Sequence, residues 1–230
     1  MTRRTYHQYC ATARTLDLVG ERWTLLLVRE LLTGPRRFGD LLSALGGMGT
    51  GLLASRLRFL QDEGLIEAAT LPAPARAPAY ALTEAGAELR PAVLALSRWG
   101  MRWAADERVE GEAFQAGWAV LGMQAVFDPD AAGDVRVVYE FRVGDETFHA
   151  RVEDRTVETA QGAAHRPDVV LSTDPDTFAA LATGGAGLVE AVRAGTASVD
   201  GDPDLVRRLP ELFRRPQPRQ RVARQPADVG

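Results

Sequence analysis

The chain has 230 residues, enough for two modest domains that each enclose a hydrophobic core. Its 46% hydrophobic and 25% charged residues are ordinary for a globular protein, and no apolar run approaches the roughly 18 residues needed to span a bilayer. One cysteine excludes an intrachain disulfide, and three scattered histidines argue against a metal site. These features predict a soluble protein of the reducing cytoplasm that needs no metal and no cofactor.

The charge is distributed unevenly along the chain. Residues 1–106 carry 13 arginines against 10 acidic residues, residues 107–213 carry 9 against 20, and residues 214–230 carry 5 against 1. Because an acidic surface repels phosphates, only the N-terminal part is expected to meet nucleic acid. The segment 214–230 is also rich in proline, which predicts a flexible basic tail.

Two helices are predicted at the start of the chain, at residues 10–18 and 23–32. In the second helix Trp23 belongs to the apolar stripe, and we interpret it as core packing. Arg36 and Arg37 begin the next helix, where the helix dipole attracts an anion. They form either a phosphate clamp or a pair of solvated side chains.

A short helix at residues 38–45 and a pair of glycines precede a helix predicted at residues 50–62. Its leucines recur at helical spacing, so the buried stripe is expected to consist of Leu52, Leu53, Leu57 and Leu60. The opposite face is small at its start and basic in its middle, which suits a helix whose N-terminus enters a DNA major groove. Taken alone, such a helix is more often a solvated element on a core. The residues expected to meet DNA here are Thr50, Gly51, Ser55, Arg56 and Arg58.

Residues 66–82 are predicted to form a hairpin with a proline-rich loop. Proline removes backbone donors and stiffens the loop, so the tip is expected to be extended. Arg76 stands at this tip and is the candidate to enter the minor groove. Two helices, a strand, a loop and a strand in this order are typical of a winged helix.

Thr83 is predicted to cap a long helix that begins at residue 84. A helix that carries two tryptophans is too apolar to remain in water. We expect it to pair with its twofold-related copy, together with the first helix, in a homodimer; packing on the second domain is the alternative. The residues expected at the dimer contact are Leu89, Val93, Leu96, Trp99 and Trp103.

Five separated motifs occur in order along residues 8–104. They are Trp23, GPRRFGDL at residues 34–41, LRFLQDEGL at 57–65, YALTEAG at 80–86 and LSRWG at 96–100. In this order and spacing they closely resemble the HxlR-type winged-helix regulators, which are bacterial relatives of the MarR class. The resemblance implies a winged-helix fold, DNA binding and transcriptional regulation. The chain departs from the family pattern at Gly49, Gly51 and Phe59, which leaves the DNA sequence preference open.

The same resemblance falls on Cys10. Some HxlR-type regulators sense quinones, aldehydes or oxidants through a cysteine near this place, and that chemistry requires a lowered thiol pKa. Arg14, one turn further along the helix, can help to stabilise a thiolate. The alternative is that Cys10 only packs on its helix.

The second half changes from helical to alternating hydrophobicity. A helix is predicted at residues 112–127, strands at 135–143, 148–152, 156–159, 168–172 and 196–199, and helices at 178–182 and 188–193. Asp174 and Asp202 each precede a proline, a pattern typical of helix starts. These features predict an α+β domain, an antiparallel sheet with helices on one face.

Three runs in this half, DVVL at residues 168–171, DPDTF at 174–178 and AGTASVDGDP at 194–203, resemble the sterol carrier protein type 2 family over residues 112–213. The resemblance implies an apolar tunnel that binds acyl chains, sterols or similar molecules. The residues that it places near the tunnel are Trp118, Phe141, Phe148, Phe178, Leu181, Leu188 and Val192. The alternative is that these residues simply fill a core.

The predicted fold class is therefore α+β, with a winged-helix DNA-binding and dimerisation domain at residues 1–106, a sterol-carrier-like domain at 112–213 and the tail at 214–230. The predicted function is a ligand-responsive transcriptional regulator: a homodimer reads a near-palindromic operator, and an apolar molecule in the C-terminal domain modulates DNA affinity. The alternative is a regulator that senses oxidants or electrophiles through Cys10, with a structural C-terminal domain. No nucleophile, base and orienting residue cluster in the sequence, so no enzymatic activity is predicted.

Overall fold

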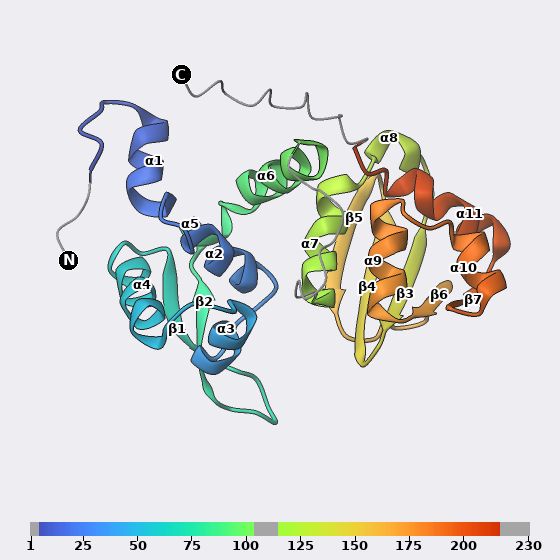
Figure 1. The fold of residues 1–230 in the computed structure, drawn as a ribbon, viewed down its shortest axis with the longest axis horizontal. Coiled ribbons are helices and arrows are strands. Elements are labelled where there is room, and N and C mark those ends of the chain that lie inside the picture. The colour runs from blue at the N-terminus through green and yellow to red at the C-terminus, as the bar shows by residue number, and fades with distance from the viewer. Residues whose placement is uncertain (1–4, 104–114, 217–230) are drawn as a thin grey trace, which may run out of the picture. The chain divides into compact units, whose positions relative to one another are not determined.

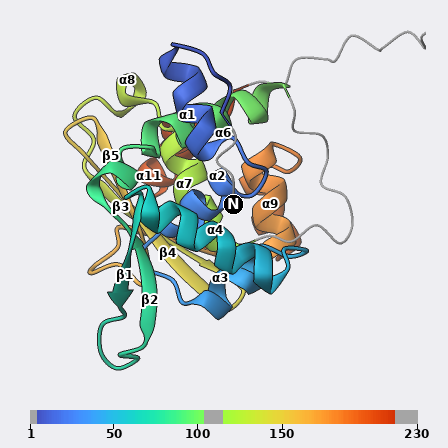
Figure 2. The ribbon, with the colours of Figure 1, turned by 90° about the vertical axis from the view of Figure 1, so that its left-hand side faces the viewer.

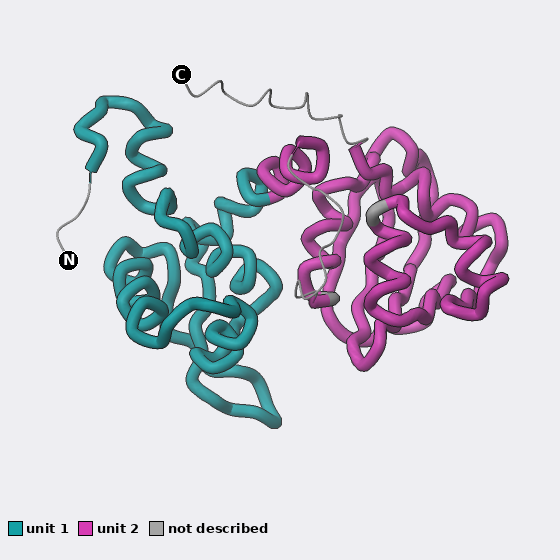
Figure 3. The backbone as a smooth tube through the Cα atoms, in the orientation of Figure 1, with its two compact units in different colours: residues 1–93 teal, residues 94–230 magenta. Residues whose placement is uncertain are grey.

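A computed structural model describes residues 5–103 and 115–216 of the chain. Two compact units, residues 1–93 and residues 94–230, are distinguished by colour in Figure 3. The division falls inside helix α6 (Arg90–Trp103), and the predicted boundary at residues 106–112 lies outside the described residues. The predicted domain limits therefore stay a prediction. The predicted tail stays one as well, because its residues 217–230 also lie outside the described residues.

The first unit begins with helices and continues into a two-stranded sheet (Figure 1). The helices are α1 (Ala11–Val19), α2 (Thr24–Leu32), α3 (Phe38–Ala44) and α4 (Thr50–Asp62), and the strands are β1 (Ile66–Thr70) and β2 (Pro78–Leu82). The strands pair antiparallel, from Ile66 opposite Leu82 to Thr70 opposite Pro78. The hairpin extends away from α3 and α4 (Figure 2). This order of elements confirms the predicted winged helix.

The core of the first unit is built from leucines that recur every three or four residues on α2, α3 and α4. Leu27, Leu41, Leu53 and Leu60 have no exposed surface, and Leu57 is 1% exposed. This spacing places each leucine on the inner face of its helix. The helices therefore pack against one another through their apolar stripes, and their outer faces remain in solvent.

The helix predicted from residue 84 is interrupted, so the prediction of one long helix is wrong. The structure contains α5 (Glu84–Ala87) and α6 (Arg90–Trp103). Thr83 caps α5 as predicted, and its hydroxyl accepts a hydrogen bond from the Gly86 N–H at 3.2 Å. Because Pro91 has no N–H, it cannot donate back to α5, and a turn replaces the helix before it.

The second unit is a five-stranded sheet with helices. Its helices are α7 (Ala116–Val126), α8 (Pro129–Ala132), α9 (Pro175–Thr183), α10 (Leu188–Ala194) and α11 (Pro203–Leu212), and its strands are β3 (Val137–Val143), β4 (Glu146–Glu153), β5 (Thr156–Gln161), β6 (Val169–Thr173) and β7 (Ala197–Gly201). The strand order is β5-β4-β3-β6-β7. The predicted α+β class is confirmed, and the sheet is antiparallel except that β3 and β6 run parallel.

The parallel pair arises because the chain crosses the sheet between β5 and β6. The crossing segment, residues 162–168, is fixed to strand β3: the Ala164 N–H donates to the Glu140 carboxylate at 2.8 Å, and the Asp168 carboxylate accepts from the Val138 N–H at 2.8 Å. Glu140 is only 2% exposed and is also paired with Arg142, with 2.7 Å between the guanidinium and carboxylate. A buried carboxylate thus holds the crossover in place.

The helices cover one face of this sheet, as predicted (Figure 1). Alternate residues of β3 and β4 point toward them, and Tyr139, Phe141, Phe148 and Val152 are 3% exposed or less. Three helix starts are capped by an aspartate that precedes a proline. These aspartates are Asp128, Asp174 and Asp202, and each accepts a hydrogen bond from a backbone N–H of the first turn.

Candidate nucleic-acid interface

The outward face of α4 is the candidate surface for DNA. Leu53, Leu57 and Leu60 attach the helix to the core. The exposed residues on the remaining surface are Thr50, Gly51, Leu52, Ala54, Arg58, Gln61 and Asp62, and Ser55 is half-buried. The first turn and a half of the helix is thus made of small or apolar residues, and a basic side chain follows.

Leu52 is exposed, and its predicted place in the buried stripe is wrong. The side chain is 40% exposed, whereas the neighbouring Leu53 has no exposed surface. Successive residues lie about 100° apart around a helix, so two adjacent leucines cannot share one narrow stripe. The stripe is built from residues 53, 57 and 60, and Leu52 lies beside it.

The two arginines of α4 have different environments. Arg56 lies 3.4 Å from the Glu21 carboxylate, its guanidinium is 5.7 Å from the centre of the Phe59 ring, and its side chain is 14% exposed. Arg58 is exposed and has no ion pair or hydrogen bond within the part of the chain that the structure describes. Arg56 therefore braces α4 against the segment before α2, and Arg58 is the arginine of this helix that is available to DNA.

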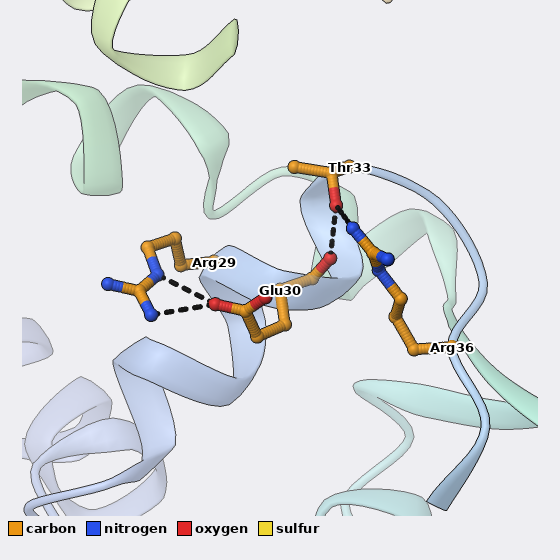
Figure 4. Close-up of polar contacts among 4 residues, drawn as sticks. All are labelled: Arg29, Glu30, Thr33 and Arg36. Atoms are coloured by element: carbon orange, nitrogen blue, oxygen red, sulfur yellow. Dashed lines mark hydrogen bonds and ion pairs between the residues drawn. The ribbon is translucent and has the colours of Figure 1, made fainter. Parts of the chain in front are cut away.

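Arg36 and Arg37 also lie in different environments. The Arg36 guanidinium donates to the Thr33 hydroxyl at 2.9 Å, and that hydroxyl donates to the Glu30 carbonyl at 2.7 Å (Figure 4). The Arg36 backbone also exchanges two hydrogen bonds with Tyr80 of the wing. Arg36 thus connects the α2–α3 turn to β2, and the phosphate clamp of Arg36 and Arg37 stays a prediction.

Arg37 is exposed at the start of α3. Its N–H donates to the Asp40 carboxylate at 3.3 Å, which fixes the first turn of the helix. An exposed guanidinium beside the N–H groups of a helix start is suited to a phosphate.

Arg76 lies at the tip of the wing, as predicted. It is exposed and adopts a positive φ of 37°, and its N–H bonds to the Pro72 carbonyl at 3.3 Å. The Leu71 N–H closes the loop on the Ala77 carbonyl at 2.9 Å. This turn carries the Arg76 side chain at the end of the hairpin.

Glu30 is a buried charged residue inside the first unit, on the apolar stripe of α2. It is 1% exposed, and the Arg29 guanidinium donates to its carboxylate through two nitrogens at 2.9 and 2.7 Å (Figure 4). Burying a carboxylate without a cation costs free energy, so the ion pair with Arg29 stabilises the buried Glu30 on α2. It lies next to the Thr33–Arg36 contact that positions the wing.

Cys10 is the N-cap residue of α1 and is exposed. The backbone N–H of Ala13, then the N–H and hydroxyl of Thr12, lower the pKa of its thiol below the ordinary value. The thiol is therefore accessible and more acidic than a free cysteine, and the alternative that it packs on its helix does not describe its position.

The residues predicted for the dimer contact separate into two groups. Leu96, Trp99 and Trp103 are 52%, 59% and 42% exposed on α6. Val93 is 6% exposed, and Leu89 is half-buried against the core of the first unit. Both side chains are therefore less accessible than the other three, and their part in a dimer contact stays a prediction.

The residues predicted to line an apolar tunnel also separate. The rings of Phe141 and Phe148 stack with their centres 5.0 Å apart, and Phe178 meets them edge-on at 6.2 and 5.6 Å. Trp118, Leu181 and Leu188 are half-buried, whereas Val192 is 42% exposed and lies at the surface. A pocket of about 290 Å³ lies elsewhere on this unit and is lined by none of these seven residues. Its lining is Arg136, Val137, Val138, Arg151, Val152, Glu153 and Asp168.

Among the described residues, no helix is both long and apolar enough to cross a membrane. No group of three or more potential metal-ligating residues was found within the same ranges.

The fold and the outward face of α4 define a winged helix-turn-helix protein. Residues 18–108 match the family model of the HxlR-like helix-turn-helix. An uncharacterized HTH-type transcriptional regulator of Synechocystis is 37% identical over 101 residues, which are 44% of this chain and 75% of that protein. The chain belongs to the HxlR-like helix-turn-helix family.

Two further likenesses were found, each to a transcriptional regulator. An uncharacterized HTH-type transcriptional regulator of Mycobacterium tuberculosis H37Rv is 44% identical over 90 residues, or 39% of this chain, and the chain spans 56% of that relative's length. A MarR-family regulator structure from Porphyromonas gingivalis has 26% identity and a TM-score of 0.38, covering 43% of this chain and 97% of that one.

Residues 122–222 match a different family model, described as alkyl sulfatase C-terminal. The sterol carrier protein resemblance of this half is therefore not confirmed.

Proposed function

We propose that this regulator of the HxlR type binds double-stranded DNA as a homodimer. The N-terminus of α4 enters the major groove, and the wing tip with Arg76 lies at the neighbouring minor groove. The observation that carries the proposal is the outward face of α4, which is small at its start and bears the unpaired Arg58 in its middle. The small residues permit a close approach of the backbone, and the guanidinium can donate to a guanine or a phosphate.

The exposed arginines support the same orientation. Arg37 at the start of α3 and Arg76 at the wing tip come from elements on either side of α4 along the chain. The acidic second half, with 9 arginines against 20 acidic residues, disfavours contact with phosphates.

The experiment is a selection of duplexes from a random-sequence pool by the full-length protein, followed by fluorescence anisotropy across salt concentrations. We expect an inverted repeat whose half-sites lie about one helical turn apart, and an affinity that falls steeply as salt rises. Failure to enrich any sequence, together with no duplex binding at low salt, would contradict DNA binding.

For the second unit we propose an effector site for an apolar molecule. The support is the apolar layer between the sheet and its helices, against which Leu181 and Leu188 pack while remaining half-buried. Trp118 on α7 is half-buried as well. The rings of Phe141, Phe148 and Phe178 pack against one another. An apolar ligand can therefore enter this layer only if the Phe178 ring moves. That ring lies on α9, which ends at Gly184 in a left-handed conformation with φ of 75°, and glycine gives the chain freedom to rearrange there.

Effector binding is tested by native mass spectrometry of the purified full-length protein, followed by a DNA-binding titration with any molecule found. A bound apolar compound that changes DNA affinity about 5- to 150-fold is the expected result. A protein that carries no guest and whose DNA affinity responds to no apolar compound would remove the effector site.

A second candidate is sensing through Cys10, which is favoured by its exposure and by the lowered pKa of its thiol. Because more thiolate is then present at neutral pH, the thiol should react with an electrophile at lower pH than a free cysteine does. The test compares DNA release by a quinone in the wild type and in Cys10→Ser. Loss of the response in the variant supports sensing, and an unchanged response excludes it.

A further inference from the structure

The first six residues of α4 contain no side chain that can make a bidentate hydrogen bond to a base. They are Thr50, Gly51, Leu52, Leu53, Ala54 and Ser55, of which Leu53 is buried. The next residue, Arg56, is engaged with Glu21 and with the Phe59 ring. Arg58 is the first exposed long polar side chain, about two turns from the helix start.

This composition restricts how the helix tip can read DNA. In the major groove, guanine is typically read by arginine or lysine, adenine by asparagine or glutamine, and cytosine by an acidic side chain. None of these side chains is present at residues 50–55. The hydroxyls of Thr50 and Ser55 can bond to any base and therefore discriminate weakly. The remaining feature of a base that this surface can recognise is the 5-methyl group of thymine.

Leu52 is the largest of the exposed apolar groups suited to that contact, which also include the Ala54 side chain and the Thr50 methyl group. It is 40% exposed although it is apolar, and it lies one residue from Gly51. A Cβ added at Gly51 would have nothing within 4 Å, so the space next to this backbone is open. A groove can approach the helix closely at the glycine, which brings the neighbouring leucine to the base edges.

We propose that Leu52 determines sequence specificity by contacting the 5-methyl group of a thymine in each half-site. The inference rests on the proposed DNA-binding function and deepens it by naming the base that the helix tip reads. Burial of one methyl group corresponds to about a fourfold change in affinity for one half-site and roughly 15-fold for the two half-sites of a dimer.

The experiment uses the full-length protein and the duplex selected from a random pool. Each thymine is replaced in turn by deoxyuridine at the two symmetric positions, which removes the methyl group and keeps the base pair. The wild type is expected to lose about 15-fold in affinity at one symmetric pair of positions. Leu52→Ala is expected to bind the thymine and deoxyuridine duplexes equally at that position. The control Val189→Ala, on an apolar residue 58% exposed on α10, should keep the wild-type loss.

The outcomes separate the inference from the function it rests on. Equal losses at every deoxyuridine position in the wild type and Leu52→Ala overturn the role of Leu52 and leave DNA binding intact. A wild type whose affinity falls at none of the deoxyuridine positions also overturns the role of Leu52 and leaves DNA binding intact. A protein that selects and binds no duplex overturns the proposed DNA binding and this inference with it.

Discussion

Arg58 combines exposure with the absence of an ion pair among the described residues, and it lies on the helix face that points away from the core. We predict that Arg58→Ala weakens binding of the selected duplex by about 1–3 kcal/mol, because an arginine that meets a guanine contributes that much discrimination. Fluorescence anisotropy measures the change. Arg193→Ala, on an exposed arginine of α10, is the matched control and should bind as the wild type does. Equal affinities for Arg58→Ala and the control would remove Arg58 from the interface.

Arg56 is expected to behave differently from Arg58. Its ion pair with Glu21 braces the helix, so Arg56→Ala should lower the free energy of unfolding as well as DNA affinity. Comparing chemical denaturation of Arg56→Ala and Arg58→Ala tests this distinction. A larger loss of stability in Arg58→Ala than in Arg56→Ala would contradict the assigned roles.

On α4, the sequence predicts which residues are buried but not which arginine is paired. Helical spacing identified the buried Leu53, Leu57 and Leu60 because burial on one helix follows from period alone. The difference between Arg56 and Arg58 depends on Glu21, which lies far along the chain, so no local pattern could reveal it. Leu52 could have been recognised as exposed, since the spacing of the other three leucines leaves it about 100° outside their stripe.

The crossover of residues 162–168 depends on Glu140. Burial acts to raise the pKa of this carboxyl, but the hydrogen bond from Ala164 and the pairing with Arg142 hold the pKa below its ordinary value. A carboxyl whose folded pKa is lowered stabilises the protein above its unfolded pKa, and this contribution is lost as the pH falls through the folded pKa.

We therefore predict that Glu140→Gln lowers the free energy of unfolding of the second unit by about 1.5–3 kcal/mol at neutral pH. The difference from the wild type should shrink as the solution becomes acidic enough to protonate Glu140. Urea denaturation followed by circular dichroism at several pH values measures this. Glu146→Gln, on an exposed carboxyl of the same sheet, is the control. A loss of the same size at every pH would show that the charge of Glu140 has no role.

The parallel pairing at the crossover could not be predicted from the sequence of the individual strands. Alternation identified the strands, and the Asp174 and Asp202 caps identified two helix starts, because both signals are local. The parallel pairing of β3 with β6 depends on contacts between Glu140 and Ala164, which are separated by a chain reversal. In the first unit, the break before α6 follows from Pro91, a signal that was present in the sequence and outweighed the apolar spacing across it.

The proposed homodimer accounts for the apolar residues that α6 leaves in solvent. Leu96, Trp99 and Trp103 are each more than 40% exposed. An exposed cluster of this kind is typical of an interface, and tryptophan is frequent among residues that carry binding energy. Val93 and Leu89 were predicted to join them, but Val93 is buried and Leu89 packs against the core of the first unit, and helical spacing alone cannot distinguish such burial from a dimer face.

We predict that Trp99→Ala weakens dimerisation by about 2 kcal/mol, roughly 30-fold in the dissociation constant. Analytical ultracentrifugation over a range of protein concentrations measures the change, with Val189→Ala as the control for loss of an exposed apolar side chain. An unchanged dissociation constant, or a wild type that is monomeric at all concentrations, would contradict the proposed interface.

DNA contact by the first unit, through α4 and the wing, is the proposal on which the other roles depend. Hydrogen–deuterium exchange of the full-length protein, with and without the selected duplex, tests it most directly. We predict slower exchange on DNA binding at residues 50–58 and 71–77, with little change at residues 146–153 of β4. Slower exchange at residues 146–153 with none at residues 50–58 would contradict it.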